Sequence, residues 1–315
     1  MSGSLPFLPP SASSVAGEFN ILFAALLAIA GAVLGLVVLL MFRFCAHYRG
    51  NNRSVDRGHQ TEKSWRWEVS WTAASFVVFL GLYAWGADIY LREHHPPGDA
   101  LDIYVVGKQW MWKIEHPGGQ REINALHVAV NRPVRLVMTS QDVIHGFFVP
   151  AFRLKQDVLP GRYVTLWFDP DRPGRYRLYC SQFCGTEHSE MGGMVTVMAP
   201  GDFEKWLAAN ASDATLAGEG AVLFHKVGCD GCHGAGATIS APPLAGIYGH
   251  AVTLRGGGNA VADEDFIRGA ILQPAEHVIA GYKPVMPSFA GQLDEEQIVS
   301  LVAYVKSLSA GGATQ

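Results

Sequence analysis

Two long apolar stretches near the start of the chain predict membrane-spanning helices. Residues 21–42 contain no charged side chain and are numerous enough for a helix to cross the hydrocarbon core. The second stretch, about 69–91, is apolar and aromatic, with tryptophan and tyrosine near its ends as at membrane interfaces. We therefore expect a transmembrane hairpin within 19–95, preceded by an N-terminal extracytoplasmic segment, 1–18.

The loop between these stretches is basic, which predicts their orientation. Positive loops stay in the cytoplasm, so the N-terminus and everything after residue 91 should lie outside. Glu68 would stand where the second helix enters the membrane, and an acidic group at this depth is either functional or simply solvated. Two buried core helices are the alternative, which length and charge asymmetry disfavour. The charged residues of the loop are Arg43, Arg49, Arg53, Arg57, Lys63 and Arg66 against Asp56 and Glu62.

Beyond the Pro-Pro-Gly break at 96–98 the hydrophobic pattern changes to a period of two. Short β-branched runs alternate with Pro, Gly and Asn/Asp turns, which predicts an antiparallel β-sandwich over 96–200. The predicted strands are 101–106, 121–124, 126–130, 134–138, 164–168 and 175–179.

The pattern changes again after residue 200. Asp202 is a candidate cap for a short helix, and small and polar residues then predict a linker within 201–217. A final domain, 218–310, should be helical, and its last helix opens with Asp294 and Gln297 in the spacing of a capping box. The net charge is −4, and no basic stripe accompanies the aromatic residues. A nucleic-acid partner is therefore not expected.

Soft metal ligands gather in one short stretch near the end of the sandwich. Cys180, Cys184, His188 and Met191 follow one another closely, and His145 lies at the end of an apolar run upstream. Thiolate, thioether and imidazole donors together favour copper, and five donors suit two metals bridged by both sulfurs. Two alternatives stay open, namely one face of a helix, which nearby glycines disfavour, and a Cys180–Cys184 disulfide.

A second group of metal ligands lies in the last domain. Cys229, Cys232 and His233 form C-x-x-C-H, the attachment signal for c-type haem. The two thiols would form thioethers to haem, and His233 would be the proximal iron ligand. A redox-active or zinc-binding thiol pair is the alternative interpretation.

His145 with the C-x3-C-x3-H-x2-M spacing resembles the dinuclear copper (CuA) domain of subunit II of cytochrome c oxidase, a cupredoxin fold. The resemblance implies that Cys180 and Cys184 bridge two coppers. His145 and His188 would each bind one copper, and Met191 would be a weak ligand of one of them.

Other family positions carry further implications. The backbone carbonyl of Gln182 would be the weak ligand of the second copper. Many members have a glutamate there that also holds magnesium, so a magnesium site stays open. The segment 107–112 resembles the family's aromatic segment, in which Trp110 receives electrons above the copper. Glu68 matches a glutamate at the mouth of a proton channel, and Asp157 an acidic residue near the cytochrome-docking and subunit I contact.

The last domain resembles a class I cytochrome c. In that family a proline carbonyl accepts the proximal imidazole N–H, which points to Pro242, and a methionine binds the distal side, which points to Met286. Such His–Met ligation raises the haem potential and suits electron transfer. The histidines that compete with Met286 are His225, His250 and His277.

Together these resemblances imply subunit II of a bacterial haem–copper oxidase with a fused cytochrome c domain. Electrons would pass from its haem to the dinuclear copper and on to haem in subunit I, where oxygen is reduced and protons are pumped. Its partners would be subunits I and III, membrane lipid and an external donor such as a cytochrome c or a quinol-oxidising complex. Both soluble domains would lie in the periplasm, anchored in the inner membrane. A CuA subunit of a nitric oxide reductase and a membrane-anchored electron carrier without a fixed partner are the alternatives.

Overall fold

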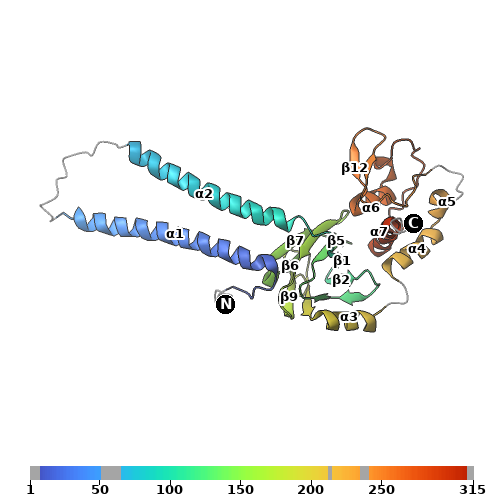
Figure 1. Ribbon diagram of the computed structural model, residues 1–315, viewed down its shortest axis with the longest axis horizontal. Coiled ribbons are helices and arrows are strands. Elements are labelled where there is room, and N and C mark those ends of the chain that lie inside the picture. The colour runs from blue at the N-terminus through green and yellow to red at the C-terminus, as the bar shows by residue number, and fades with distance from the viewer. Residues whose placement is uncertain (1–7, 51–64, 212–214, 235–240, 311–315) are drawn as a thin grey trace. The chain divides into compact units, whose positions relative to one another are not determined.

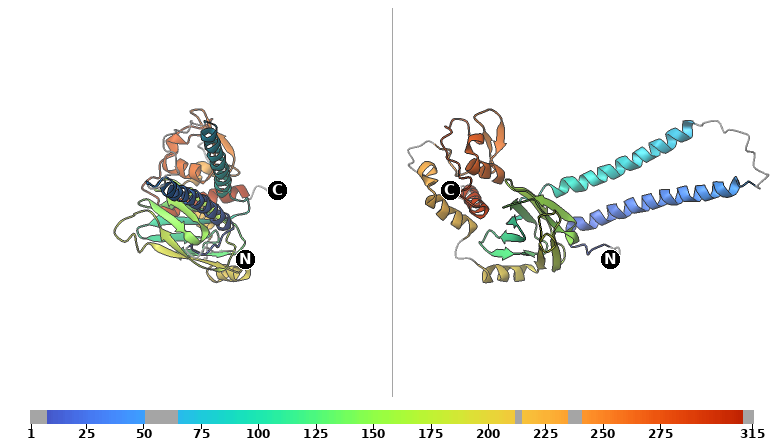
Figure 2. Two further views of the ribbon diagram at one scale, coloured as in Figure 1. Left: turned by 90° about the vertical axis from the view of Figure 1, so that its left-hand side faces the viewer. Right: turned by 180° about the vertical axis from the view of Figure 1, so that it is seen from behind.

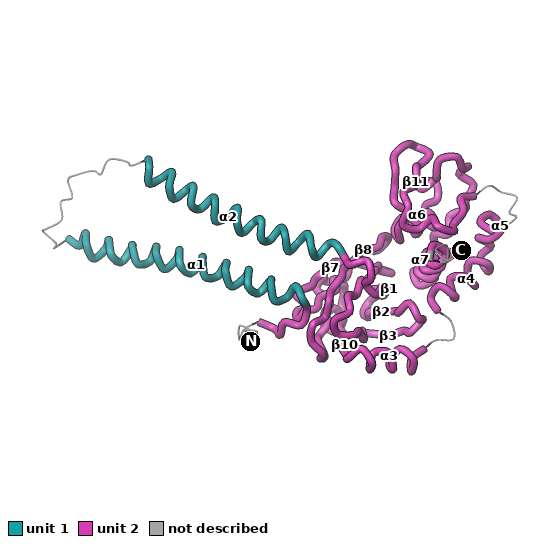
Figure 3. The backbone as a smooth tube through the Cα atoms, in the orientation of Figure 1, with its two compact units in different colours: residues 1–3, 14–95 teal, residues 4–13, 96–315 magenta. Residues whose placement is uncertain are grey.

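The computed structural model describes residues 8–50, 65–211, 215–234 and 241–310 (Figure 1). The chain forms two compact units (Figure 3): the first contains 14–95, and the second contains 96–315 together with the segment just before residue 14. The predictions for Arg53, Arg57, Lys63, Asp56 and Glu62 of the basic loop fall outside the described residues.

The first unit is a pair of long helices, α1 (Ser14–His47) and α2 (Trp65–Glu93), which lie alongside each other (Figure 2). Both are long and apolar enough to cross a membrane, and most of their apolar side chains are exposed. They extend beyond the predicted ranges, and Arg92 of α2 pairs with Glu18 of α1. Glu68 lies exposed in the first turn of α2.

A sandwich of two five-stranded sheets begins the second unit. The strand orders are β3-β2-β1-β5-β8 and β4-β10-β9-β6-β7. The predicted β-sandwich is confirmed and most of its pairs are antiparallel, but β1 pairs with β5 and β10 with β4 in parallel. Parallel neighbours are joined by long crossovers, which local alternation along the sequence cannot reveal. The strands are β1 (Leu101–Lys108), β2 (Met111–Glu115), β3 (Arg121–Ile123), β4 (Ala125–Ala129), β5 (Val134–Ser140), β6 (His145–Val149), β7 (Leu154–Val158), β8 (Val164–Phe168), β9 (Gly174–Cys180) and β10 (Gly192–Met198), with a 3₁₀ turn η1 (Pro150–Phe152).

Strand β1 is buried on both faces. Ile103 and Val105 point into the core between the two sheets, as expected for alternate residues of a strand. Tyr104 and Val106 point the other way, yet they are also buried, in a second core that they share with the C-terminal helices. The outer face of this sheet is therefore covered by the last third of the chain.

The remaining elements are mostly helical. Asp202 does not cap α3, since Ala199 occupies the N-cap position, Pro200 starts the helix and Asp202 lies in its first turn. Pro can take this first position because its missing N–H needs no partner there. The elements are α3 (Pro200–Ala209), α4 (Leu216–Lys226), α5 (Asp230–His233), β11 (Ala251–Thr253), β12 (Asn259–Val261), α6 (Glu264–Leu272), η2 (Pro274–Glu276) and α7 (Glu295–Ala310).

Helices α4 and α7 pack closely and hold this segment together. A Cβ at Gly220 would lie 2.0 Å from the carbonyl oxygen of Ser300, so only glycine permits the approach. The predicted capping box of α7 is confirmed: the Gln297 N–H donates to Asp294 Oδ1 at 2.9 Å, and the Asp294 N–H donates to Gln297 Oε1 at 3.0 Å.

Glu115, at the end of β2, is buried beside other carboxylates. Burial raises its pKa to about 7, against the opposing effect of Arg121, and Glu219 and Glu296 raise it further. A carboxyl whose pKa is higher in the folded state holds its proton more tightly there. Folding stability is therefore lost as pH rises from about 4.5 to about 7.

We expect Glu115→Gln to stabilise the protein at pH 8 by about 2 to 3 kcal/mol and to have little effect at pH 5. The neutral amide removes the cost of burying a charge, a cost that wild type carries only above its folded pKa. Thermal unfolding of the full chain in detergent at both pH values measures this. Glu204→Gln, on the exposed side of α3, is the control, and an equal loss of stability at both pH values would contradict the expectation.

Candidate metal centre

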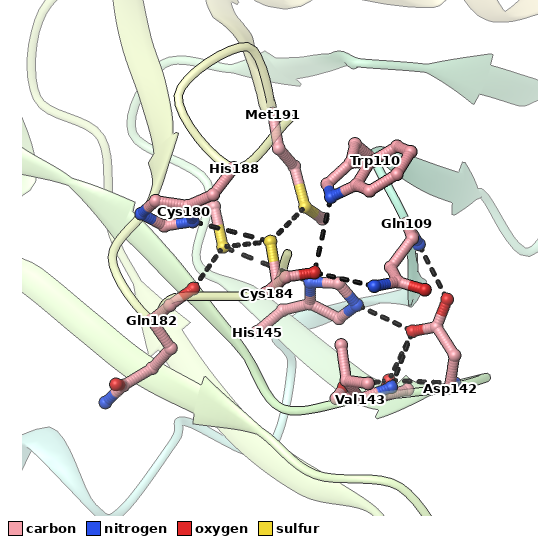
Figure 4. Close-up of polar contacts among 11 residues, drawn as sticks. Gln109, Trp110, Asp142, Val143, His145, Cys180, Gln182, Cys184, His188 and Met191 are labelled. Carbon is pink, nitrogen blue, oxygen red and sulfur yellow. Dashed lines mark hydrogen bonds and ion pairs between the residues drawn. The ribbon is translucent and has the colours of Figure 1, made fainter. Parts of the chain in front are cut away.

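The five predicted soft donors meet at one end of the sandwich (Figure 4). His145 opens β6 and Cys180 closes β9, and these strands pair antiparallel, with Phe147 opposite Cys180. The loop 181–191 then carries the other donors and returns into β10. The loop consists of turns and irregular backbone, so the helix alternative was wrong.

The distances among the donors suit two metal ions that share the sulfurs. Cys180 Sγ and Cys184 Sγ lie 3.8 Å apart, and both cysteines are free, which excludes a disulfide in this structure. His145 Nδ1 lies 4.0 Å from Cys180 Sγ, whereas His188 Nδ1 lies 3.4 Å from Cys184 Sγ. Met191 Sδ is 3.7 Å from Cys184 Sγ. Each imidazole thus stands beside a different sulfur.

Asp142 orients the buried imidazole of His145. Its Oδ1 lies 2.8 Å from His145 Nε2, which leaves Nδ1 directed at the sulfurs. Asp142 also accepts the backbone N–H groups of Gln109 and Val143, both at 2.7 Å. Such a carboxylate fixes the tautomer and direction of a metal-binding histidine. Sequence reasoning missed Asp142, although an acidic residue three positions before a predicted histidine ligand was a visible signal.

The two thiols differ in acidity. Burial acts to raise the pKa of Cys180, but contacts with His145 and with backbone groups outweigh it and lower that pKa. Burial and then the neighbouring Cys180 raise the pKa of Cys184. Metal ions bind thiolates, so metal loading of this pair would release at least the Cys184 proton.

Trp110 packs against the rim of the site. Its indole N–H donates to the Cys184 carbonyl at 3.2 Å, and the Gln109 amide donates to the same oxygen at 2.7 Å. The ring is partly buried rather than fully exposed. Gly185 makes room for it: its φ is +118°, and a Cβ there would lie 2.9 Å from Gln109 Nε2 and 3.3 Å from the indole.

Gln182 has separate backbone and side-chain roles. Its backbone carbonyl lies 3.2 Å from Cys180 Sγ, within the donor cluster. Its side-chain amide points away and donates to Asp157 Oδ2 at 2.8 Å. The amide nitrogen cannot bind a cation, and the side-chain carbonyl oxygen carries no charge, so this position offers magnesium a weaker ligand than a glutamate carboxylate would. The family's magnesium site therefore stays an open prediction.

The C-x-x-C-H residues lie at a separate apolar cavity of about 320 Å³ between α4, α6 and α7. Cys229, Cys232 and His233 line it together with Met286 and Pro242. His233 Nδ1 lies 3.0 Å from the Pro242 carbonyl oxygen, which leaves the other ring nitrogen available to a metal. A large apolar cavity bordered by two thiols, an imidazole and a thioether fits covalently held haem.

The histidines that compete with Met286 lie in different places. His277 lines the same cavity. His225 Nδ1 lies 2.8 Å from Asp230 Oδ2, and His250 Nδ1 lies 3.1 Å from the Tyr248 carbonyl, and neither of these two histidines lines the cavity. Geometry therefore leaves Met286 and His277 as candidates.

Comparisons with known proteins identify both halves of the second unit. Residues 118–198 match the family described as cytochrome c oxidase subunit II, periplasmic domain, and residues 215–305 match cytochrome c oxidase, cbb3-type, subunit III.

Two curated relatives cover most of the chain. The alternative cytochrome c oxidase subunit 2 of Bradyrhizobium diazoefficiens is 28% identical over 63% of this chain and 82% of the relative. Cytochrome c oxidase subunit 2 of Thermostichus vulcanus is 30% identical over 66% of this chain and 80% of the relative.

One solved structure is similar to part of this chain. The crystal structure of the periplasmic domain of subunit II of cytochrome oxidase from Bradyrhizobium japonicum is 31% identical, covers 37% of this chain and 96% of that one, and has a TM-score of 0.36. With both halves matched and a relative covered over most of its length, the chain belongs to the cytochrome c oxidase subunit II family, as a subunit of that oxidase that carries an additional cytochrome c domain.

Proposed function

We propose that this chain is the electron-input subunit of a membrane-bound terminal oxidase. Electrons would pass from its own c-type haem to a dinuclear copper centre and then to haem in subunit I, where oxygen is reduced to water with proton pumping. The observation that carries the proposal is the placement of His145 and His188 beside different sulfurs of one thiol pair. One zinc ion needs only four ligands, whereas this arrangement provides for two coppers.

The roles of the donors follow from their contacts. Cys180 and Cys184 would bridge the metals, and each histidine would bind one of them. Met191 Sδ and the Gln182 carbonyl lie near opposite sulfurs, so each would be the weak ligand of a different copper. Bridging thiolates spread one electron over two metals, and a site held by paired strands changes little in shape when the electron arrives or leaves.

The residues around Trp110 would carry electrons in from outside the copper site. The indole N–H reaches the backbone of Cys184, so the ring is coupled to a bridging residue through one hydrogen bond. In the cytochrome c domain His233 and Met286 would bind the iron, and Pro242 would hold the imidazole in its tautomer.

The membrane anchor would be α1 and α2, with both soluble parts in the periplasm at the bacterial inner membrane. The basic residues of the loop sequence support this orientation through the positive-inside bias. Subunit I is the partner that family membership implies, while subunit III and an external cytochrome c or quinol-oxidising donor are further proposals. Glu68 would lie on the cytoplasmic side, at the mouth of a proton channel of subunit I. The proposed domains are the transmembrane hairpin 19–95, the copper-binding sandwich 96–200 and the cytochrome c domain 218–310. The linker 201–217 joins the last two.

Metal and haem analysis of the purified complex, with electron paramagnetic resonance, tests the proposal. We expect two coppers per chain that share one unpaired electron, and one haem that stays attached after denaturation. Rapid mixing with a reduced donor should then show haem oxidation at the rate of copper reduction. A single copper with an ordinary four-line spectrum would reject the dinuclear site. A complex that reduces nitric oxide and not oxygen would identify the chain as a subunit of a nitric oxide reductase.

A further inference from the structure

The haem-bearing segment and the sandwich meet through a network of four charged side chains, of which Glu264 is buried and the other three are partly buried. Asp102 on β1 and Arg135 on β5 are register partners and form a two-point ion pair at 2.6 and 2.9 Å. Arg135 also donates to Glu264 of α6 at 2.8 Å. Lys306 of α7 contacts Asp102 and donates to Glu264 at 3.0 Å. Acidic and basic groups therefore alternate across the junction.

The two negative and two positive charges of the network balance each other. Burial alone would raise the pKa values of Asp102 and Glu264, but Arg135 and Lys306 outweigh it and hold both carboxyls below their usual pKa. The Tyr248 hydroxyl donates to Glu264, and Lys306 Nζ lies 4.9 Å from the Tyr248 ring centroid. A buried charge without a partner is costly, so each member of the set requires the others in place.

A second set of contacts lies at the loop before β8. Arg268 of α6 donates to the carbonyl of Gly161, and the Tyr163 N–H donates to Asp265 at 2.9 Å. The guanidinium of Arg268 lies 5.7 Å from the Tyr163 ring centroid and pairs with Glu295. This loop is thus bound to α6, and Arg268 links it to the start of α7 through Glu295.

Apolar side chains from both sides join between these polar contacts. Tyr104, Val106, Val137 and Tyr163 of the sandwich are 4%, 5%, 1% and 6% exposed. They belong to the same buried cluster as the inner residues of α6 and α7. Outward-facing residues of a sandwich strand are normally polar because they meet water. Their apolar character here shows that this face is built to be covered.

We propose that the outer face of the β1–β5 pair is a permanent docking surface for the chain's own cytochrome c domain, and that the Asp102–Arg135–Glu264–Lys306 network sets its position. The haem would then deliver electrons from one fixed place instead of moving on its linker between a donor and the copper. Buried ion networks often contribute little net stability, yet they disfavour every register in which a charge is left alone. The same face is closed to external partners.

The test uses a variant that removes the charges from one side only. Glu264→Gln with Lys306→Met eliminates both charges of the haem-bearing side and leaves the Asp102–Arg135 pair satisfied. Asp202→Asn with Lys205→Met is the matched control, because that pair lies exposed on α3. Lys306→Arg keeps the charge and should behave as wild type. All are studied in the intact oxidase complex, with haem content and the copper spectrum checked first.

Two readouts follow the docking. Oxidative footprinting should find Tyr104 and Tyr163 protected in wild type relative to Tyr179, which is 45% exposed, and reactive in the double variant. Flash-induced electron transfer from haem to copper should be independent of salt in wild type, because buried charges are weakly screened. In the double variant it should become at least tenfold slower and dependent on salt.

The outcomes are decisive in both directions. Reactive Tyr104 and Tyr163 in wild type would overturn the proposal, as would a double variant that keeps both protected and transfers electrons at the wild-type rate. An undocked variant with an unchanged rate would overturn it as well. The inference rests on the proposed function only for the kinetic readout. A wild-type complex without the copper or haem signal would reject the proposed function. Footprinting reports on the docking surface whether or not copper and haem are detected.

Discussion

Replacing the two thiols that we propose bridge the coppers, Cys180→Ser with Cys184→Ser, is expected to abolish the copper centre and reduce electron transfer from haem to subunit I by more than about 100-fold. Removal of an outer partner of a metal ligand already costs about 10- to 100-fold in affinity or activity, so loss of both shared ligands should cost more. The thiols lie 3.8 Å apart at the centre of the donor cluster, and hydroxyl groups are poor ligands for copper.

Copper analysis, electron paramagnetic resonance and single-turnover reduction kinetics measure this effect. Cys45→Ser is the matched control, since that cysteine lies exposed on α1 and is not among the predicted metal ligands. The haem should remain attached and reducible in the double variant, which separates loss of copper from loss of the whole chain. Normal electron delivery without copper would contradict the assignment.

Cys229→Ala with Cys232→Ala is expected to remove covalent haem and unfold the cytochrome c domain. Without haem, the domain is left with a cavity of about 320 Å³ among apolar side chains. Such a cleft either admits water among apolar side chains or collapses, and both outcomes weaken the packing of the domain. Oxygen uptake with an external cytochrome donor should therefore fall to background.

Haem staining after denaturing electrophoresis measures the loss of covalent haem. Limited proteolysis, followed by identification of cleavage sites after residue 215, measures unfolding of the domain. The copper spectrum of the same preparation is the internal control, because Cys180, Cys184 and Met191 belong to a different core. Haem that remains attached after both thiols are removed would contradict the role of the C-x-x-C-H motif. A domain that resists proteolysis without haem would contradict the energetic argument.

The sequence predicted the parts of the metal centre that lie close together along the chain. Cys180, Cys184, His188 and Met191 share one loop, so their spacing alone indicated a cluster. His145 was included as a fifth donor because it lies at the end of a predicted strand, but its approach to the loop could not be derived, because the pairing of β6 with β9 is set by contacts distant in sequence. Asp142 was overlooked for a related reason: its importance depends on where the ring of His145 points.

The fold was likewise predictable where it depends on local patterns and not where it depends on contacts distant in sequence. The apolar lengths of α1 and α2 and the capping box of α7 are local patterns, and the structure contains them. The parallel pairing of β1 with β5 depends on a crossover that alternation does not encode. The partner of Lys306 on β1, Asp102, was equally hidden, since an isolated lysine on a helix is usually solvated.

The two-sided burial of β1 affects how this protein can be divided. A fragment that ends before α4 would present Tyr104, Val106 and Val137 to water, together with the Asp102–Arg135 pair. Such a surface promotes self-association, so a soluble copper-binding fragment would need polar replacements at these positions. The fusion of the two redox modules is therefore encoded in the sheet itself as well as in the linker between them.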